Sequence, residues 1–162
     1  MSPAAEPDLP GGGLGYALAR AAHAWRAGLA EALADVEVTP PQFFVLAALL
    51  HAETRDRPPP TQRAVAAQTG IDPNTTSQIV RGIERRGLVV RAPSERDSRA
   101  LALSLTPEGL ELASLCGRRA RALNREFFAG VDAVPLYETL LGLAAYPVVP
   151  SANAASARRP GT

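Results

Sequence analysis

Residues 61–91 read TQRAVAAQTGIDPNTTSQIVRGIERRGLVVR, and the helix starts and stops in this segment indicate the fold class. Thr61 is a good N-cap for a short helix that stops at Gly70, the residue type favoured where a helix ends in a left-handed turn. A second helix begins at once, because Asp72 can cap it and Pro73 suits the first helical position. This second helix extends to about Arg86. Two short, capped helices joined by a tight turn predict a helix-turn-helix.

After the second helix the apolar residues change from helical spacing to alternation. Residues 88–90 (LVV) read as a short strand, and residues 101–105 (LALSL) alternate leucine with smaller residues in another. The segment 93–99 between them is polar, so we expect a two-stranded hairpin with a long, charged tip. A helix-turn-helix followed by such a hairpin predicts a winged helix-turn-helix.

Further helices are expected on both sides of this unit. Apolar residues at helical spacing run through residues 14–36, and TPPQ at 39–42 reads as a capping box that opens a helix. After the hairpin, a long helix over 107–127 and an amphipathic helix over 134–145 follow. The predicted fold class is therefore mainly α with a small β-hairpin wing and long N- and C-terminal helices.

Composition places the chain among soluble, intracellular proteins. Its 162 residues suffice for one domain with a sizeable core, and 46% of them are hydrophobic. No apolar run reaches the roughly 20 residues that a spanning helix needs. The first residues lack the basic flank and apolar stretch of a signal peptide. A single cysteine, Cys116, excludes an intrachain disulfide and suits a reducing compartment, so we expect a cytoplasmic location.

The charge is distributed unevenly along the chain. The formal net charge is only +1, and every basic residue apart from the histidines is arginine. Between Arg81 and Arg99 there are six arginines against three acidic residues, so this window is locally basic. Because the window covers the second helix and the hairpin, it predicts a surface that binds a polyanion such as double-stranded DNA.

Several motifs resemble one known family in order and spacing. They are TPPQFFVL at 39–46, TQ…TGIDPNT at 61–75, IERRGLVVR at 83–91, and RDSRA at 96–100 followed by LTPEG at 105–109. Together they resemble the pattern of the MarR (multiple antibiotic resistance regulator) family from about Leu14 to Ala145. The resemblance implies a homodimeric transcriptional regulator, a repressor or an activator, which small molecules often induce to leave DNA. We expect a repressor that binds a pseudo-palindromic operator.

The outer face of the second helix carries the candidate DNA-reading side chains. Burying Ile79, Val80 and Ile83 leaves polar residues on or near that face. Glutamine can pair with adenine and arginine with guanine, while hydroxyls serve bases or phosphates. The candidates are Asn74, Thr75, Ser77, Gln78 and Arg81. For Gln78 and Arg81 phosphate contact or plain solvation is the alternative, and for the other three it is the chemistry of a helix start.

Two residues of that helix depart from the family pattern. Gly82 stands where a larger polar residue is usual and should cost the helix up to about 1 kcal/mol relative to alanine. Thr76 takes a place that is usually apolar, which predicts looser seating of the helix on its neighbours.

In the wing, the resemblance implies that Arg99 enters the DNA minor groove and that Asp97 orients it through a charge-assisted bond. Ser98 lies between them where many relatives have a second arginine, and Arg96 could compensate. The alternative for Arg99 is a solvated loop arginine.

Leftover apolar surface predicts the dimer. Segments 14–38 and 107–146 carry apolar stripes with too few partners inside a small winged lobe at 39–106, so burial in a twofold dimer is the simplest solution. Folding of both segments back onto their own lobe is the alternative. We expect residues 1–13 and 147–162 to be disordered.

Other function classes find less support in the sequence. His23 and His51 have no carboxylate at a metal-ligand spacing and no phosphate-binding loop occurs, so we expect neither an enzyme nor a cofactor. Cys116 lies on an apolar helix and is more consistent with packing than with redox sensing. A winged helix used only for protein–protein contacts is the alternative to a DNA-binding regulator.

An effector site is also conceivable from the sequence. His23, Trp25 and Arg26 on the first helix, with Arg118 or Arg119 on the long helix, could line a cavity for a small aromatic or anionic effector. A core tryptophan and surface arginines explain the same residues.

Overall fold

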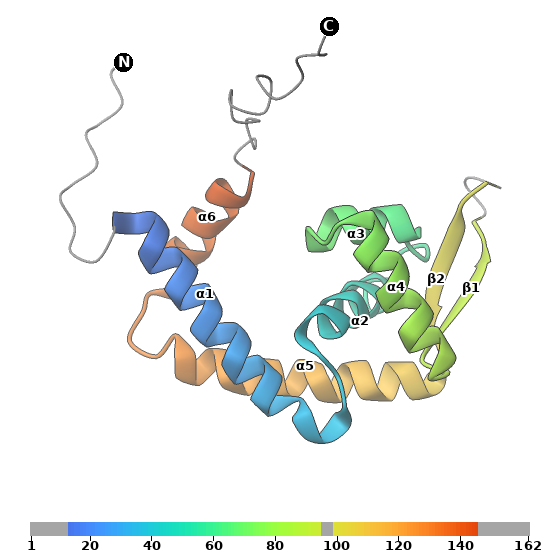
Figure 1. Cartoon of the computed structure of the whole chain (residues 1–162), viewed down its shortest axis with the longest axis horizontal. Coiled ribbons are helices and arrows are strands. Elements are labelled where there is room, and N and C mark those ends of the chain that lie inside the picture. Colours follow the sequence, from blue (N-terminus) through green and yellow to red (C-terminus); the bar gives the residue numbers. More distant parts are fainter. Residues whose placement is uncertain (1–12, 95–98, 146–162) are drawn as a thin grey trace, which may run out of the picture. The chain divides into compact units, whose positions relative to one another are not determined.

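The computed structural model describes residues 13–94 and 99–145, which form two compact units divided between Phe127 and Phe128 (Figure 1). Arg96, Asp97, residues 1–12 of the predicted arm and the predicted tail lie outside the described residues, whereas Gly13, expected to be the last residue of that arm, begins α1. The first unit contains α1 (Gly13–Ala32), the 3-10 turn η1 (Ala34–Val36), α2 (Pro40–Glu53), α3 (Gln62–Thr69), α4 (Pro73–Arg85), β1 (Val89–Pro93), β2 (Leu101–Leu105) and α5 (Pro107–Phe127). The second unit contains α6 (Ala133–Ala144).

The predicted helix starts and stops of the helix-turn-helix are present. The Thr61 hydroxyl accepts a hydrogen bond from the Ala64 amide at 3.2 Å and begins α3, which ends at Gly70 in the left-handed region at φ 68°. The Asp72 carboxylate accepts from the amides of Asn74 and Thr75, both at 3.0 Å, and begins α4. Both helices pack against α2. These caps fix where each helix begins.

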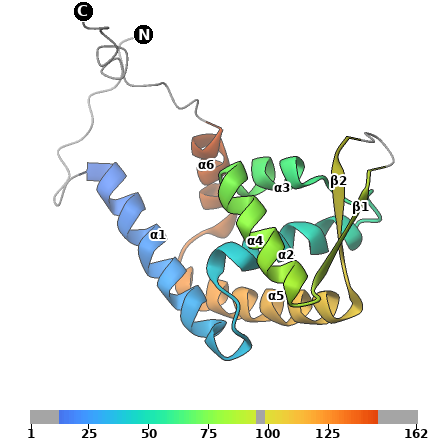
Figure 2. The ribbon, with the colours of Figure 1, turned by 45° about the vertical axis from the view of Figure 1, so that its right-hand side comes forward.

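The hairpin pairs β1 with β2 antiparallel, with Val89 opposite Leu105 and Pro93 opposite Leu101. A bridge between Thr61 and Ala102, and a 2.9 Å bond from the Leu103 amide to the Pro60 carbonyl, attach the start of α3 to β2. The first strand is longer than the LVV run predicted, because pairing with β2 carries it on to Pro93. Within the first unit, Figures 1 and 2 show α4 alongside the hairpin and α1 far from it.

The first helix is shorter than predicted. The pattern over 14–36 reads as one helix, but α1 ends at Ala32 and η1 follows. Glu37 then takes a left-handed conformation at φ 53°, and the chain leaves the helix axis there. Leu29 and Leu33 are fully buried, whereas Leu14 and Leu18 near the start of α1 are exposed. Only the C-terminal half of the helix therefore joins the core.

The core lies between α1, α2, α3, α4, the hairpin and α5. Its fully buried larger side chains are Leu29, Leu33, Val45, Leu46, Val65, Thr76, Val80, Ile83, Val89, Leu103 and Cys116. Of the three residues expected to be buried on α4, Ile79 is only half-buried. In the described part of the chain no helix is long and apolar enough to cross a membrane.

The base of the hairpin is joined closely to α5. The Thr106 hydroxyl donates to the Gly87 carbonyl at 2.7 Å and accepts from the Gly109 amide at 3.0 Å. Gly109 lies so close to the hairpin that a Cβ atom there would fall 1.9 Å from the Leu88 carbonyl oxygen. Glycine at this position therefore allows α5 to start directly under the wing.

Candidate nucleic-acid interface

One face of α4 is buried and the opposite face is polar and exposed. Thr76, Val80 and Ile83 are buried against the core. Asn74, Gln78 and Arg81 are exposed and recur at intervals of four and three residues, which is the spacing of one helix face. Thr75, beside Asn74 in the first turn, is exposed as well. An α-helix held by one face and polar on the other fits the major groove of DNA.

Ser77 and Arg81 form a pair along the helix. The Arg81 Nε donates to the Ser77 carbonyl at 3.3 Å, and Nη2 donates to the Ser77 hydroxyl at 3.2 Å. Ser77 is half-buried, so it lies at the margin of the polar face rather than at its centre. The pair turns the Arg81 guanidinium towards the N-terminal part of α4, where Asn74 and Gln78 lie.

The Asp72 carboxylate stabilises the first turn of α4. Hydrogen bonds from Thr75, through its side chain and backbone, hold the pKa of Asp72 below its ordinary value of 3.8. A carboxylate at this end also complements the positive end of the helix dipole. Asn74 and Thr75 donate their backbone amides to this cap, and the Thr75 side chain bonds to the same carboxylate, while both residues stay exposed.

The two departures from the family pattern have different structural outcomes. Thr76 is fully buried, and its hydroxyl donates to the Ile71 carbonyl at 3.3 Å. Its polar group is therefore satisfied, and burial of α4 against the core is kept, so the looser seating predicted from this residue finds no support. A Cβ atom at Gly82 would meet nothing within 4 Å, so packing in the described chain does not explain a glycine there.

Arg81, Arg86 and Arg91 of the basic window have partners inside the protein. Besides the Arg81 pair, Arg91 on β1 forms a 2.7 Å ion pair with Glu84 on α4. Arg86, at the end of α4, donates to the carbonyls of Val36 and Glu37. The charge count along the sequence therefore overstates what this window presents to DNA. The links of Arg86 and Arg91 could not be predicted from the sequence, because each joins two different elements.

The wing is described in part. The Ser94 amide donates to the Ala100 carbonyl at 2.9 Å, which closes the described end of the hairpin. Arg99 is exposed next to this closure. The predicted contact between Asp97 and Arg99 and the role of Arg96 stay predictions, because residues 95–98 lie outside the described chain.

An open groove of about 610 Å³ lies on the first unit, between α1, α2 and the end of α3. Trp25 stacks on Phe44 with ring centroids 6.0 Å apart and planes at 8°. The indole Nε1 donates to the Asn124 side-chain oxygen at 2.8 Å, which fixes the ring. The groove is lined by Ala22, Trp25, Arg26, Phe44, Ala47, Ala48, His51, Gln68 and Thr69. It therefore combines an aromatic stack with two basic side chains.

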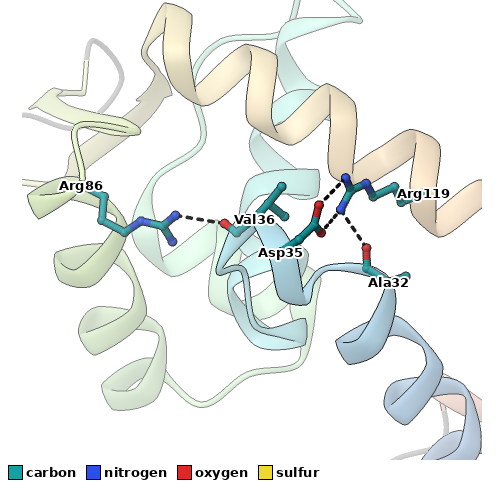
Figure 3. Close-up of polar contacts among 5 residues, drawn as sticks. All are labelled: Ala32, Asp35, Val36, Arg86 and Arg119. Atoms are coloured by element: carbon teal, nitrogen blue, oxygen red, sulfur yellow. Dashed lines mark hydrogen bonds and ion pairs between the residues drawn. The ribbon is translucent and has the colours of Figure 1, made fainter.

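The structure brings together only some of the predicted effector residues. Trp25 and Arg26 line the groove, and His51 joins them from α2. His23 is exposed on α1 and is not part of the lining. Arg119 instead binds Asp35 and the Ala32 carbonyl (Figure 3). Arg118 is exposed on α5.

Two separate helices expose large apolar side chains. On α1, Leu14, Tyr16 and Leu18 are exposed. On α6, the exposed side chains are Val134, Tyr137, Leu140, Leu141 and Leu143, and the helix has no buried residue. Cys116, in contrast, is fully buried on α5, and burial raises the pKa of its thiol.

Comparison with known proteins agrees with this geometry. A model of the MarR family matches residues 37–100, the stretch from the start of α2 to the hairpin. The uncharacterized HTH-type transcriptional regulator YdcH of Bacillus subtilis is 29% identical over 119 residues, covering 71% of this chain and 78% of that protein.

Solved structures give the same assignment. A MarR-family transcriptional regulator from Rhodococcus sp. RHA1 superposes with a TM-score of 0.65 at 25% identity, over 80% of this chain and 88% of that one. The repressor CouR bound to a 23-mer DNA duplex has a TM-score of 0.65 at 28% identity, over 82% of this chain and 89% of that one. CouR of Rhodococcus jostii RHA1 bound to p-coumaroyl-CoA has a TM-score of 0.69 at 25% identity, over 84% and 94%. With its capped helix-turn-helix, its hairpin wing and these relatives in agreement, the chain belongs to the MarR family of DNA-binding transcriptional regulators.

Proposed function

We propose that the chain is a homodimeric repressor that binds a pseudo-palindromic operator, with α4 in the major groove and the wing at the minor groove. The polar face of α4 is the observation that carries this proposal. Asn74, Gln78 and Arg81 lie exposed on one side of a helix whose other side is buried in the core. A rigidly held helix can present these side chains to DNA at a fixed depth in the groove.

Each side chain of the interface has a role set by its place on the helix. Gln78 and Arg81, in the middle of α4, are the base readers, since glutamine can pair with adenine and arginine with guanine. Asn74, Thr75 and Ser77, near the start of the helix, position it on the phosphates. Arg99, with Arg96 and Asp97, completes the interface at the minor groove.

The dimer is supported by the apolar side chains that α1 and α6 expose. Each large apolar side chain that is fully buried contributes about 1.5–3 kcal/mol, so the several that each helix exposes favour association. We assign segments 14–38 and 107–146 to the dimer interface and 39–106 to the DNA-binding lobe. A regulator of this kind works where the chromosome is, which places it in the cytoplasm.

The groove beside Trp25 supports release by an effector. Its Trp25–Phe44 stack suits a flat aromatic group, and Arg26 and His51 suit an anionic one. The effector-bound relative CouR holds p-coumaroyl-CoA, a ligand that has both features. We therefore assign a small aromatic anion to Trp25, Arg26 and His51, and leave His23 and Arg119 out of the site because they do not line this groove.

Two measurements on the full chain test the function. Sedimentation equilibrium at micromolar concentration should give about twice the 17.0 kDa mass of one chain. Binding to operator DNA should weaken steeply with salt, because each neutralised phosphate adds about 0.9 to the slope of log affinity against log salt concentration. A monomer, or DNA retention that salt does not change, would favour the alternative of a winged helix that binds other proteins.

A further inference from the structure

The turn that ends α1 is held from two sides by arginines of two other helices. From α4, the Arg86 Nη1 donates to the Glu37 carbonyl at 2.8 Å and Nη2 donates to the Val36 carbonyl at 3.3 Å. Arg86 is 50 residues from Val36 in sequence and is the C-cap residue of the recognition helix. These two bonds therefore connect the end of α4 directly to the end of η1.

On the other side, α5 supplies Arg119. Its two terminal nitrogens bind both oxygens of the Asp35 carboxylate, with Nη2–Oδ2 at 2.9 Å, and Nη1 also donates to the Ala32 carbonyl at 3.1 Å (Figure 3). Ala32 is the last residue of α1, so the cation lies at the negative end of that helix. Figure 3 shows Arg86 and Arg119 approaching the turn from opposite sides.

The turn needs such partners because its backbone is irregular. The last carbonyls of a helix have no partners within it, and charged donors bind them more strongly than neutral ones. Glu37 has a positive φ of 53°, a backbone conformation that residues other than glycine rarely adopt. Leu33 and Val38, on either side of this turn, are both buried in the core, so the turn connects two anchored points of the chain and sets the direction in which α1 leaves them.

We infer that Arg86 and Arg119 are positioning residues that hold the recognition helix and α1 at a fixed mutual angle and thereby set the half-site spacing the protein accepts. This inference rests on the proposed dimeric operator binding, in which α1 contributes to the dimer contact. The distance between the two recognition helices then depends on the angle between α1 and α4 in each protomer. Arg86 acts on specificity through the turn rather than through a contact with DNA.

The competing role for Arg86 is a phosphate contact, and the two roles differ in their signatures. Loss of a phosphate contact weakens binding to all duplexes equally and lowers the salt slope by about 0.9. Loss of a positioning contact leaves the salt slope unchanged and reduces discrimination between spacings. Arg85, the exposed neighbour on the same helix end, is the matched control for loss of one positive charge.

The test measures affinity on operators whose half-sites are at the preferred spacing or moved by one base pair in either direction. For Arg86→Met we expect about tenfold weaker binding at the preferred spacing, a salt slope equal to that of the unmodified protein, and at least a threefold smaller penalty for the moved half-sites. Arg86→Gln, which keeps amide donors but no charge, should restore part of the spacing preference. Arg85→Met should keep the spacing preference in full. A reduced slope with unchanged spacing preference in Arg86→Met would overturn the inference.

A second variant approaches the turn from the other side. Asp35→Asn weakens the Arg119 contact and removes a negative charge, which by itself would strengthen DNA binding. We expect it instead to reduce the spacing preference as Arg86→Met does, and stronger binding with the preference intact would overturn the inference. If the unmodified protein shows no spacing preference or binds as a monomer, the proposed function fails. If the unmodified protein shows the preference and the variants keep it, only the inference about Arg86 and Arg119 fails.

Discussion

Replacing two glycines by alanine, one at a time, should change stability in opposite directions. Gly109 is at the start of α5 and Gly82 is inside α4, and both are helical. The same methyl group is added in each case. The difference between the two variants therefore reports the local surroundings and not the chemistry of the substitution.

The structure sets the magnitude at each position. At Gly109 the added Cβ would lie 1.9 Å from the Leu88 carbonyl oxygen, whereas real Cβ contacts essentially never fall below 3.0 Å. The backbone of α5 and the hairpin must therefore separate by about 1 Å, which disturbs the bonds of Thr106 to Gly87 and Leu88. Overpacking typically costs about 1–3 kcal/mol and occasionally more, and we expect about 3 kcal/mol because backbone atoms must move.

Gly82 provides the control. A Cβ there meets nothing within 4 Å, so only the helical preference of alanine over glycine acts, which stabilises by up to about 1 kcal/mol. Thermal unfolding followed by circular dichroism, at one fixed protein concentration, measures both variants. A shift of about 2–4 °C per kcal/mol is expected for a chain of this size. Gly109→Ala as stable as the unmodified protein would refute the close crossing of α5 under the wing.

Four further substitutions test the interface and the turn. Gln78→Ala and Arg81→Ala should each cost about 1–3 kcal/mol at one base pair, measured by anisotropy titrations on operators with single base changes; equal losses on every sequence would place the side chain on phosphate. Arg99→Ala should leave the fold and dimer intact but weaken binding most on operators with A·T-rich flanks, and unchanged affinity would exclude a wing contact. The hydrogen bond and charge of Arg119 hold the pKa of Asp35 below its ordinary 3.8, so the unfolded chain takes up this proton at higher pH than the folded one. The contact therefore contributes to the free energy of unfolding above pH 3.8, and this contribution is lost as the pH falls below that value. In acid unfolding, the stability of Asp35→Asn should fall less steeply with pH than that of the unmodified protein.

The helix-turn-helix could be predicted from sequence because its signals are local. Thr61, Gly70 and Asp72 act within three residues of their own positions, so the caps require no knowledge of the rest of the chain. Alternation likewise marks β2, whose register then follows from pairing with β1. The polar face of α4 follows from spacing once the buried positions are known.

The remaining features depend on tertiary contacts. The end of α1 at Ala32 depends on the turn that Arg86 and Arg119 hold, and those residues are distant from it in sequence. From the sequence alone, Arg119 was a candidate effector-binding residue because of its positive charge. Its contact with Asp35 could not be predicted, because the two residues are far apart in the sequence. The part of the groove formed by His51 was missed for the same reason, since only the packing of α1 on α2 brings it near Trp25.

Selection of binding sites from a library of randomised duplexes tests most directly whether α4 reads an operator as part of a dimer. A dimer with one α4 in each major groove should select a twofold-symmetric consensus whose half-site centres lie about one helical turn, or 10 base pairs, apart. Selection with Gln78→Ala should lose the preference at one symmetric pair of positions and keep the rest. Enrichment of no sequence, or of the same sequence by the protein with and without Gln78, would contradict the assignment of α4 as the reading helix.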